Sequence, residues 1–527
     1  MDGPSISLSH QIKSKIDRAV ATSDWQDLFP RAYVQLMSWG GSDHRCLLLD
    51  TGNRKWRGYK LFLYDNRWRF DPAVKQEIHK VWTTQCQDIQ NTNFHLALKK
   101  CRVSLSRWKS KHITNSQKKI QELKSKLHKA YETLPINYAH INDLKNQLVK
   151  EYRLEEEYWR TKSRVQWLQA GDKNTRYFHA KTKQRRNFNR LTSLVDEQGN
   201  VCTKEDEIYN LVETYFSTLF TSHGSNNMEE VLTSIQPRVT EEMNNHLTKP
   251  VTEEELSQAL CSMNRNKSPG PDGLGAGFYK DHWAVLSKGV FQYVQNFFNT
   301  GTLDPKLNHT HICLIPKVEN PLEVKDYRPI SLCNVAYKLI SKILADRLKP
   351  WLQFIISENQ TAFIPGRMII DNVLIAHELI HSLQTRNLKQ PYMAFKLDIS
   401  KAFDKVEWSF LEAVMKKLGF AERWCAWIME CITTVTYSVL VNGSPIGNIL
   451  PQRGIRQGDP ISPYLYLLYS ERLSALIRHN IHQGKLHGFK ASRNGPPISH
   501  LLFADDSLLF CKATVEECTA LLQVLNQ

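Results

Sequence analysis

The pattern of apolar and polar positions divides the chain into three stretches of different character. Residues 1–75 mix short apolar runs with turns, and the run Cys46–Leu49 after a Gly-Gly-Ser-Asp turn is typical of a strand. Residues 76–195 are highly charged and nearly free of glycine. From about residue 196 to the last residue, helix and strand patterns alternate with Gly/Pro turns between them. We therefore expect an α/β (α+β) fold with several structural units.

The charged stretch predicts a helical hairpin. Its apolar residues recur at steps of three and four: Ile113, Ile120, Leu123 and Leu127, then Ile141, Leu144 and Leu148. The pattern breaks at Leu134-Pro135. Because proline removes a helix hydrogen bond and clashes with the preceding turn, two helices that pack against each other are expected.

The end of this stretch alternates basic and aromatic side chains. The basic residues are Lys173, Arg176, Lys181, Lys183, Arg185, Arg186 and Arg190, and the aromatic ones are Tyr177, Phe178 and Phe188. Basic side chains neutralise phosphates and aromatic faces stack on bases, so Lys181, Lys183, Arg185 and Arg186 are candidate nucleic-acid contacts. A solvated basic helix end is the alternative.

Three acidic residues stand where a strand ends or turns. Met393, Phe395 and Leu397 alternate along one face of a predicted strand that ends at Asp398, and the spacing of Phe403, Val406 and Phe410 predicts a helix after it. A carboxylate at such a strand end is well placed to bind a hard cation together with substrate phosphates.

A second acidic pair lies between two apolar runs. The segment SHLLFADDSLLFCK predicts a β-hairpin with Asp505 and Asp506 at its tip. If Asp398 and Asp505 lie side by side, they can hold two divalent cations, and Asp506 adds a further acid. On its own, an Asp-Asp sequence is as well explained by an ordinary polar turn.

The amino-acid composition predicts a polyanionic partner. The 527 residues carry 69 Lys and Arg against 53 Asp and Glu, a net charge of +16. Such an excess favours nucleic acid or an anionic membrane surface, with mere solubility as the alternative. Nucleic acid is preferred because no apolar run approaches the roughly 20 residues of a membrane span. The partner prediction is therefore nucleic acid and no membrane.

Cysteine usage and the first residues bear on location. The 11 cysteines form no Cys-x-x-Cys pair and no zinc-finger spacing, which indicates reduced thiols. The start MDGPSISLSHQIKSK lacks the pattern of a secretory signal. We expect a protein of the nucleus, the cytoplasm or both, which is not secreted.

Six ordered blocks resemble the reverse transcriptases of non-LTR retrotransposons, above all those of plant long interspersed elements. The blocks are NKSPGPDG at 266–273, LIPKVENPLEVKDYRPISL at 314–332, ENQTAFIPGR at 358–367, KLDISKAFDKV at 396–406, GIRQGDPISPYLY at 454–466 and FADD at 503–506. The resemblance implies the fingers and palm of a right-hand polymerase. It further implies RNA-directed DNA synthesis on an RNA template, from a DNA primer, with dNTPs and Mg²⁺ (or Mn²⁺).

The resemblance also implies roles for single residues. Asp398, Asp505 and Asp506 match the metal-binding acids, in agreement with the reasoning above. Phe403 matches an aromatic gate against the ribose 2′-hydroxyl, although a core residue on a helix face would have the same spacing.

Further basic and loop residues match nucleotide-binding positions of the family. Lys317 and Arg328 match residues that grip the incoming triphosphate, for which the planar fork of arginine is suited. Gln457 and Gly458 match a loop that contacts the template and the nascent pair, where glycine permits close backbone approach.

The first residues resemble another enzyme of the same elements. Asp17, followed by Gly41-Ser42-Asp43-His44, is similar to the last strands of an apurinic-type endonuclease. By this resemblance His44 and Asp43 are active-site residues, and Asp17 lies next to them without itself contacting the substrate. Since the metal-binding part of that enzyme would lie before Met1, we expect a remnant without nuclease activity.

These resemblances predict an endonuclease remnant at 1–75, a basic helical linker at 76–195, fingers with an N-terminal extension at 196–390, and a palm without a thumb at 391–527. A group II intron maturase would share the palm but normally lacks the Ser-Asp-His segment. The remaining alternative is a catalytically inactive nucleic-acid-binding fragment of such an element, which should bind RNA or single-stranded DNA and synthesise little.

Overall fold

The computed structural model describes residues 18–22, 25, 28–29, 32–36, 46–51, 61–85, 94–112, 116–163, 175–222, 224, 228–386, 390–492 and 494–526. The chain divides into two compact units. The first unit comprises Met1–Tyr59 and Asn115–Arg190, and the second comprises Lys60–Thr114 and Leu191–Gln527.

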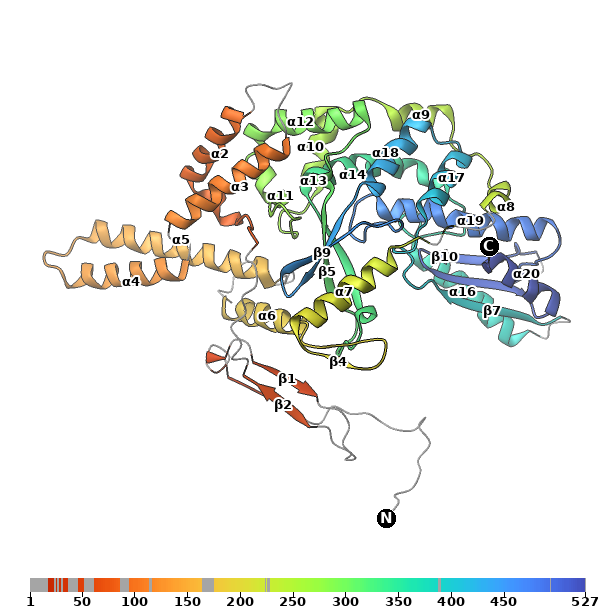
Figure 1. The fold of residues 1–527 in the computed structure, drawn as a ribbon, viewed down its shortest axis with the longest axis horizontal. Helices are drawn as coiled ribbons and strands as arrows, with labels where there is room; N and C mark the ends of the chain where they lie inside the picture. Colours follow the sequence, from red (N-terminus) through yellow and green to blue (C-terminus); the bar gives the residue numbers. More distant parts are fainter. Residues whose placement is uncertain are drawn as a thin grey trace, which may run out of the picture. The chain divides into compact units, whose positions relative to one another are not determined.

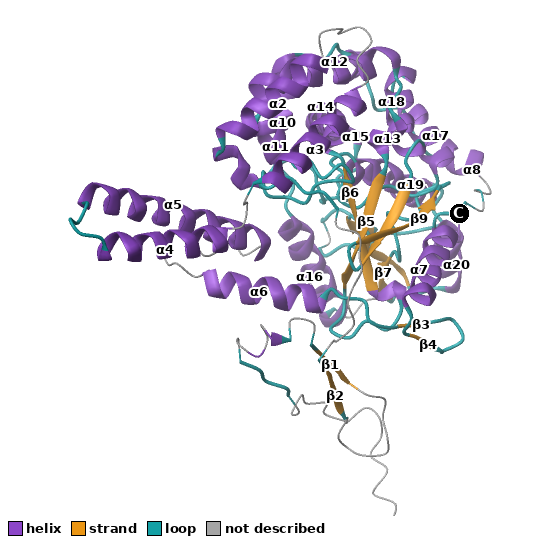
Figure 2. Cartoon of the chain, turned by 60° about the vertical axis from the view of Figure 1, so that its left-hand side comes forward, coloured by secondary structure: helices purple, strands orange, loops and turns teal. Residues whose placement is uncertain are grey.

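The first unit contains the predicted helical hairpin. Helices α4 (Ser116–Glu132) and α5 (Tyr138–Ser163) lie side by side, as Figures 1 and 2 both show. Their facing residues are buried: Ile120 and Leu123 on α4, and Ile141 and Leu144 on α5. The prediction from the three- and four-residue spacing is thus confirmed.

Among its described residues, the first unit also contains a pair of strands and helix α6. Strands β1 (Tyr33–Leu36) and β2 (Leu47–Asp50) pair antiparallel, which confirms the strand predicted near Cys46–Leu49. Helix α6 (Thr175–Phe188) carries the basic and aromatic segment.

The residues described in the second unit form three sheets. The four-stranded sheet has the order β6-β5-β8-β9, in which β5 pairs antiparallel with β6 and parallel with β8. The three-stranded sheet β10-β11-β7 is antiparallel throughout, and β3 pairs with β4. The strands are β3 (Leu194–Val195), β4 (Val201–Cys202), β5 (Thr310–Pro316), β6 (Tyr327–Cys333), β7 (Tyr392–Asp398), β8 (Tyr437–Val441), β9 (Ser444–Ile449), β10 (His500–Phe503) and β11 (Asp506–Lys512).

Helices surround these sheets (Figure 2). The longer ones are α2 (Pro72–Gln85), α3 (Phe94–Lys111), α7 (Glu205–Leu219), α9 (Glu241–Thr248), α10 (Glu253–Ser262), α12 (Trp283–Thr300), α14 (Val335–Leu348), α16 (Ile369–Thr385), α17 (Trp408–Leu418), α18 (Glu422–Thr433), α19 (Ser462–His482) and α20 (Val515–Asn526). The shorter ones are η2 (Asn66–Phe70), α8 (Met228–Thr233), α11 (Ala276–Asp281), α13 (Pro305–Asn308), η3 (Val324–Asp326), η4 (Lys349–Trp351) and α15 (Leu352–Ile355).

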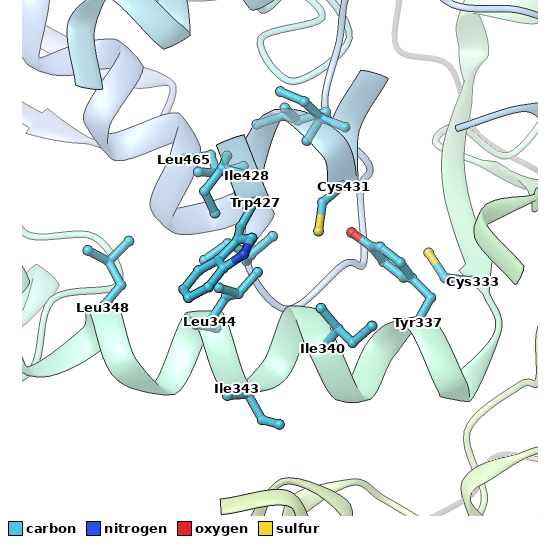
Figure 3. Packing of buried hydrophobic residues seen from close by; sticks show 14 of the residues in the cluster. Cys333, Tyr337, Ile340, Ile343, Leu344, Leu348, Trp427, Ile428, Cys431 and Leu465 are labelled. Atoms are coloured by element: carbon cyan, nitrogen blue, oxygen red, sulfur yellow. The ribbon is translucent and has the colours of Figure 1, made fainter. Parts of the chain in front are cut away.

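Helix α14 is the centre of the main core. Tyr337, Ile340 and Leu344 on one side of α14 point toward Trp427 and Cys431 of α18 (Figure 3). All five side chains are buried and belong to one apolar cluster. Burying a large apolar side chain contributes about 1.5–3 kcal/mol, so this layer is a rigid base for the loops that leave it.

Helix α7 covers the four-stranded sheet. Its buried residues Ile208, Val212 and Phe216 share a second cluster with Ile312 of β5 and Val439 of β8. Together, the sheets and their helical layers confirm the predicted α/β class with fingers and palm.

The predicted domain bounds stay a prediction, although the compact units begin and end elsewhere. Helix α3 and all but the first four residues of α2 fall within the predicted linker, yet both helices belong to the second unit. In the part of the chain that the structure describes, the cysteines are free thiols, and no helix is both long and apolar enough to span a bilayer.

Candidate active site

The three acids meet at one end of the three-stranded sheet. In the β7–β11 ladder Asp398 lies directly opposite Asp506. Asp505 stands just before β11, in the turn that joins β10 to β11, and its carbonyl accepts a hydrogen bond from the Ile399 amide at 3.4 Å. Thus residues more than 100 positions apart in sequence become neighbours. The hairpin predicted from SHLLFADDSLLFCK is confirmed, with Ala504 and Asp505 as its tip.

The donor chemistry of these acids fits a hard divalent cation. Asp398 and Asp506 are exposed and Asp505 is half-buried, so none of the three carboxylates is enclosed in the core. Carboxylate oxygens are the ligands that Mg²⁺ and Mn²⁺ prefer. Nevertheless, among the described residues no three His, Cys, Asp or Glu side chains gather closely enough to hold a metal ion, and Lys396 Nζ lies 3.8 Å from Asp506 Oδ1. The backbone places the acids at one sheet end, while their side chains are not drawn together.

Phe403 stacks on a second ring beside the acids. Its ring lies 5.0 Å from that of Tyr466, with an interplanar angle of 12°. Burial and then the negative charge of Asp505 raise the pKa of Tyr466 above its usual range. Tyr466 thus contacts Phe403 and also lies close enough to Asp505 to be affected by its charge. Phe403 is half-buried against the main core, so its ring is not wholly enclosed.

One local prediction holds only in part. The helix predicted after Asp398 from the spacing of Phe403, Val406 and Phe410 is α17, which begins at Trp408 and includes Phe410, whereas residues 401–405 form turns. Lys401 adopts a left-handed conformation with φ of 57°, which a regular helix cannot accommodate. The turn, rather than a helix face, presents Phe403.

Lys317 and Arg328 lie where β5 ends and β6 begins. Arg328 pairs with Ile315 across the ladder, and the Lys317 amide donates to the Asp326 carbonyl at 2.8 Å. Both side chains are exposed. Partial burial, followed by the positive charges of Lys401 and Arg328, lowers the pKa of Lys317, while the charges of Asp404 and Asp326 oppose this effect. Three cations and two carboxylates therefore share one region.

The sequence reasoning missed Lys401 and Asp404, which flank Phe403. Burial raises the pKa of Asp404 to about 6, against the opposing influence of Lys401 and Lys317. Lys401 Nζ lies 5.4 Å from the centre of the Tyr215 ring, and neither this nitrogen nor Asp404 Oδ2 has a hydrogen-bond partner. The charges of the KAFD segment around an aromatic residue were the available signal.

The predicted loop Gln457-Gly458 packs against β6. The Gln457 carbonyl accepts a hydrogen bond from the Ser331 amide at 2.8 Å. Gly458 has φ of 104°, and a Cβ there would lie 3.4 Å from the Ser331 carbonyl oxygen. This conformation requires glycine. The loop thus runs beside the strand that carries Arg328.

A buried ion pair flanks this loop and was also missed. Arg456 Nε lies 3.2 Å from Asp459 Oδ2, and both side chains are about 1% exposed. Tyr337 and Ser341 of α14 donate to Asp459, the former at 2.6 Å, and Arg456 donates to Asn308 Oδ1 at 2.6 Å. Two opposite charges on either side of Gln457-Gly458 were the signal. Because removal of one partner would leave a buried charge, the pair fixes both ends of the loop.

The basic segment forms helix α6 of the first unit. Lys181, Arg185 and Arg186 are exposed and Lys183 is half-buried. Phe178 is only 2% exposed, so its ring is not free to stack on a base. Phe188 is 50% exposed, and Lys181 Nζ lies 5.9 Å from the Tyr177 ring centre. The predicted endonuclease residues Asp17, Asp43 and His44 lie outside the described residues.

Acids on an antiparallel sheet, beside a cluster of cations and a glycine loop, define a polymerase palm with its fingers. Residues 315–527 match the family described as reverse transcriptase (RNA-dependent DNA polymerase). The chain accordingly carries a reverse transcriptase domain of the non-LTR retrotransposon kind, which confirms the family predicted from the six blocks.

Three relatives support this assignment. The chain is 30% identical over 356 residues to the "Transposon TX1 uncharacterized 149 kDa protein" of Xenopus laevis, covering 67% of this chain and 27% of that one. It is 26% identical over 264 residues to the Pol polyprotein from the type-2 retrotransposable element R2DM of Drosophila melanogaster, covering 50% of this chain and 23% of that one. It is 25% identical over 283 residues to the "Probable RNA-directed DNA polymerase from transposon BS" of Drosophila melanogaster, covering 52% of this chain and 25% of that one. The chain spans about a quarter of the length of these relatives.

Proposed function

We propose that this chain extends a DNA primer on an RNA template, transferring nucleotides from dNTPs to the primer 3′-hydroxyl. The observation that carries the proposal is the β7–β11 register, which sets Asp398 opposite Asp506 with Asp505 beside them. A palm with this arrangement has its carboxylates at a sheet end, where phosphates can approach without crossing the core.

Asp398 and Asp505 would hold Mg²⁺ or Mn²⁺, and Asp506 would complete the acid cluster. When bound, such cations lower the pKa of a hydroxyl nucleophile and stabilise charge on the leaving phosphate. Lys317 and Arg328 would bind the triphosphate, since both are exposed next to each other at the β5–β6 end. Phe403 would exclude a ribose 2′-hydroxyl, and the Gln457-Gly458 loop would contact the template and the nascent pair.

The partners in this proposal are an RNA template, a DNA primer or target, and dNTPs. The net charge of +16 supports polyanionic partners. Nuclear or cytoplasmic location would follow from access to RNA and DNA. We further propose that residues 1–75 derive from an apurinic-type endonuclease, on the resemblance of Asp17, Asp43 and His44, and that residues 76–195 link it to the fingers (196–390) and palm (391–527).

Replacement of each acid tests the catalytic assignment. Primer extension by the chain should require Mg²⁺ or Mn²⁺, and Asp398→Asn, Asp505→Asn or Asp506→Asn should each lower the rate by about a thousandfold, which corresponds to about 4 kcal/mol of transition-state stabilisation. Asp206→Asn, on the exposed first turn of α7, is the matched control and should retain full rate. Near-full synthesis by an active-site variant would remove that acid from the site.

A second candidate is binding of nucleic acid without synthesis. It is favoured by the exposed Lys181, Arg185 and Arg186 on one helix. Asp505→Asn separates the two functions, because it should abolish extension while leaving affinity for single strands unchanged. If the parent chain binds a primer-template but extends none at any Mg²⁺ or Mn²⁺ concentration, this second function stands alone.

A further inference from the structure

The segment after α15 is attached to the catalytic hairpin along its backbone. Gln360 forms a parallel bridge with Leu502 of β10. The Leu502 amide donates to the Asn359 carbonyl at 2.8 Å, and the Thr361 amide donates to the Leu502 carbonyl at 3.2 Å. Residues 359–361 thus extend the three-stranded sheet beyond β10, on the side away from β7.

The side chain of Gln360 reaches the tip of the hairpin. Its Oε1 accepts hydrogen bonds from the Ala504 amide and from the Ala362 amide, each at 3.0 Å, and the residue is 1% exposed. Ala504 has φ of 53°, a left-handed conformation that costs a non-glycine residue free energy. Because Ala504 immediately precedes Asp505, a contact that holds its amide also fixes the direction in which the chain enters Asp505.

Other contacts make Gln360 itself a fixed point. Arg367 donates to the carbonyls of Ser357 at 2.6 Å and of Gln360 at 2.7 Å, and also to those of Gln353 and Ile356. The Gln360 Nε2 atom is buried without a hydrogen-bond partner, so all the hydrogen bonding of this amide passes through its oxygen. The side chain acts as an acceptor between two backbone amides.

We infer that Gln360 is a positioning residue that holds the Ala504 turn, and through it Asp505, in the arrangement required to bind a divalent cation. The inference rests on the proposed function, because it assigns Asp505 to the cation site. It concerns the geometry of the hairpin, however, and is therefore tested without nucleotide incorporation.

Three variants of the full chain test the acceptor. Gln360→Met removes the oxygen at similar volume, and Gln360→Glu keeps an oxygen acceptor in either protonation state. Thr361→Val is the matched control, since Thr361 is the adjacent buried residue and its Oγ1 has no hydrogen-bond partner. Mn²⁺ binding is followed by electron paramagnetic resonance, and hydrogen exchange of the peptide over residues 501–508 is followed by mass spectrometry.

Gln360→Met should raise the Mn²⁺ dissociation constant about tenfold or more, as loss of a group that orients a metal ligand typically does. It should also speed exchange at 501–508, whereas Thr361→Val should match the parent and Gln360→Glu should keep the exchange protection. Parent-like Mn²⁺ affinity and exchange in folded Gln360→Met would overturn the inference. Should that variant fail to fold, unprotected exchange at 501–508 in folded Gln360→Glu would overturn it instead.

The proposed function has its own separate outcome. A parent chain that binds Mn²⁺ through Asp505, shown by loss of binding in Asp505→Asn, but extends no primer leaves the role of Gln360 standing and removes polymerase activity. Parent-like Mn²⁺ binding by Asp505→Asn removes both, because Asp505 is then not a ligand.

Discussion

At the scale of the residue, the ring of Phe403 is held by contacts that a core side chain alone would not need. It stacks on Tyr466, and its carbonyl accepts a hydrogen bond from the Ile455 amide at 2.8 Å, next to the Arg456–Asp459 pair. The stack holds one face of the ring, the hydrogen bond holds the backbone of the same residue, and the ring is only half-buried. This arrangement is compatible with the proposed gate, and replacement of the ring tests it.

Phe403→Ala should admit ribonucleotides. Without the ring, the proposed steric barrier to a 2′-hydroxyl disappears, so the preference for dNTPs over ribonucleotides should fall about tenfold or more, or at least 1.36 kcal/mol. The measurement is kcat/KM for each nucleotide class in primer extension, with Phe403→Tyr as the control that retains a ring. Unchanged discrimination in Phe403→Ala would return this residue to the core.

Asp404 should make folding stability depend on pH. Burial raises its pKa to about 6, whereas an aspartate in an unfolded chain titrates near 3.9. Because the folded-state pKa is the higher one, the unfolding free energy contributed by this group is greatest below about pH 4 and falls as pH rises through about 6, by about 3 kcal/mol. Urea unfolding of the parent and of Asp404→Asn between pH 4 and 7.5 measures the difference. Parallel pH profiles would contradict the prediction.

The sequence predicted these single residues unequally. Asp398, Asp505 and Asp506 could be found because a carboxylate at a strand end is visible in the alternation of apolar positions. Lys401, Asp404, Arg456, Asp459 and Gln360 could not, since their roles depend on burial and on partners far away in the sequence. No local sequence pattern indicates that the Gln360 side chain accepts a hydrogen bond from the Ala504 amide.

At the scale of the element, spacing predicted the helices that have one buried face and failed where the backbone leaves regular geometry. In the α4–α5 hairpin, the apolar residues spaced three and four apart form one buried face, which includes Ile120, Ile141 and Leu144. After β7, in contrast, Lys401 has a positive φ, so a regular helix cannot pass through this position. Phe403 therefore belongs to a turn and not to a helix face. A lysine gives no sequence signal of positive φ, in contrast to a glycine or an asparagine.

Helix α6 should bind single strands through its charges. Each neutralised phosphate releases counterions, so log affinity should fall with log salt by about 0.7 per phosphate contacted. Charge reversal to Glu at Lys181, Lys183, Arg185 and Arg186 should flatten that slope, as measured by fluorescence anisotropy with a labelled oligonucleotide. Reversal of Lys118, Lys119, Lys126 and Lys129 on α4 is the matched control and should change it less. An unchanged slope in the α6 variant would reduce this helix to a solvated surface.

At the scale of the whole molecule, the two compact units have separate cores. The apolar clusters built around Leu344 and around Val439 draw their described members from the second unit alone. In the first unit, α5 packs against both α4 and α6, and the buried side chains of α4 and α5 form a narrow seam. Units without a shared core should lose their structure in separate transitions.

Leu144→Ala should therefore affect one unit only. Its side chain is 4% exposed in the α4–α5 seam, and truncation of a buried leucine costs about 2–5 kcal/mol. Differential scanning calorimetry should show one transition lowered and the other unmoved, while Leu344→Ala in α14 should do the reverse. A single transition that shifts with either variant would show that the units unfold together.

The parallel pairing of β5 with β8 has a consequence for synthesis on the ribosome. β5 ends at Pro316, its parallel partner begins only at Tyr437, and the strand with Asp398 lies between them. Until Tyr437–Val441 emerge, β5 has a neighbour on one side only, and its free edge can pair with another nascent chain. Chaperone dependence should accordingly concentrate in the interval between these two strands, and ribosomes stalled within it should yield aggregation-prone products.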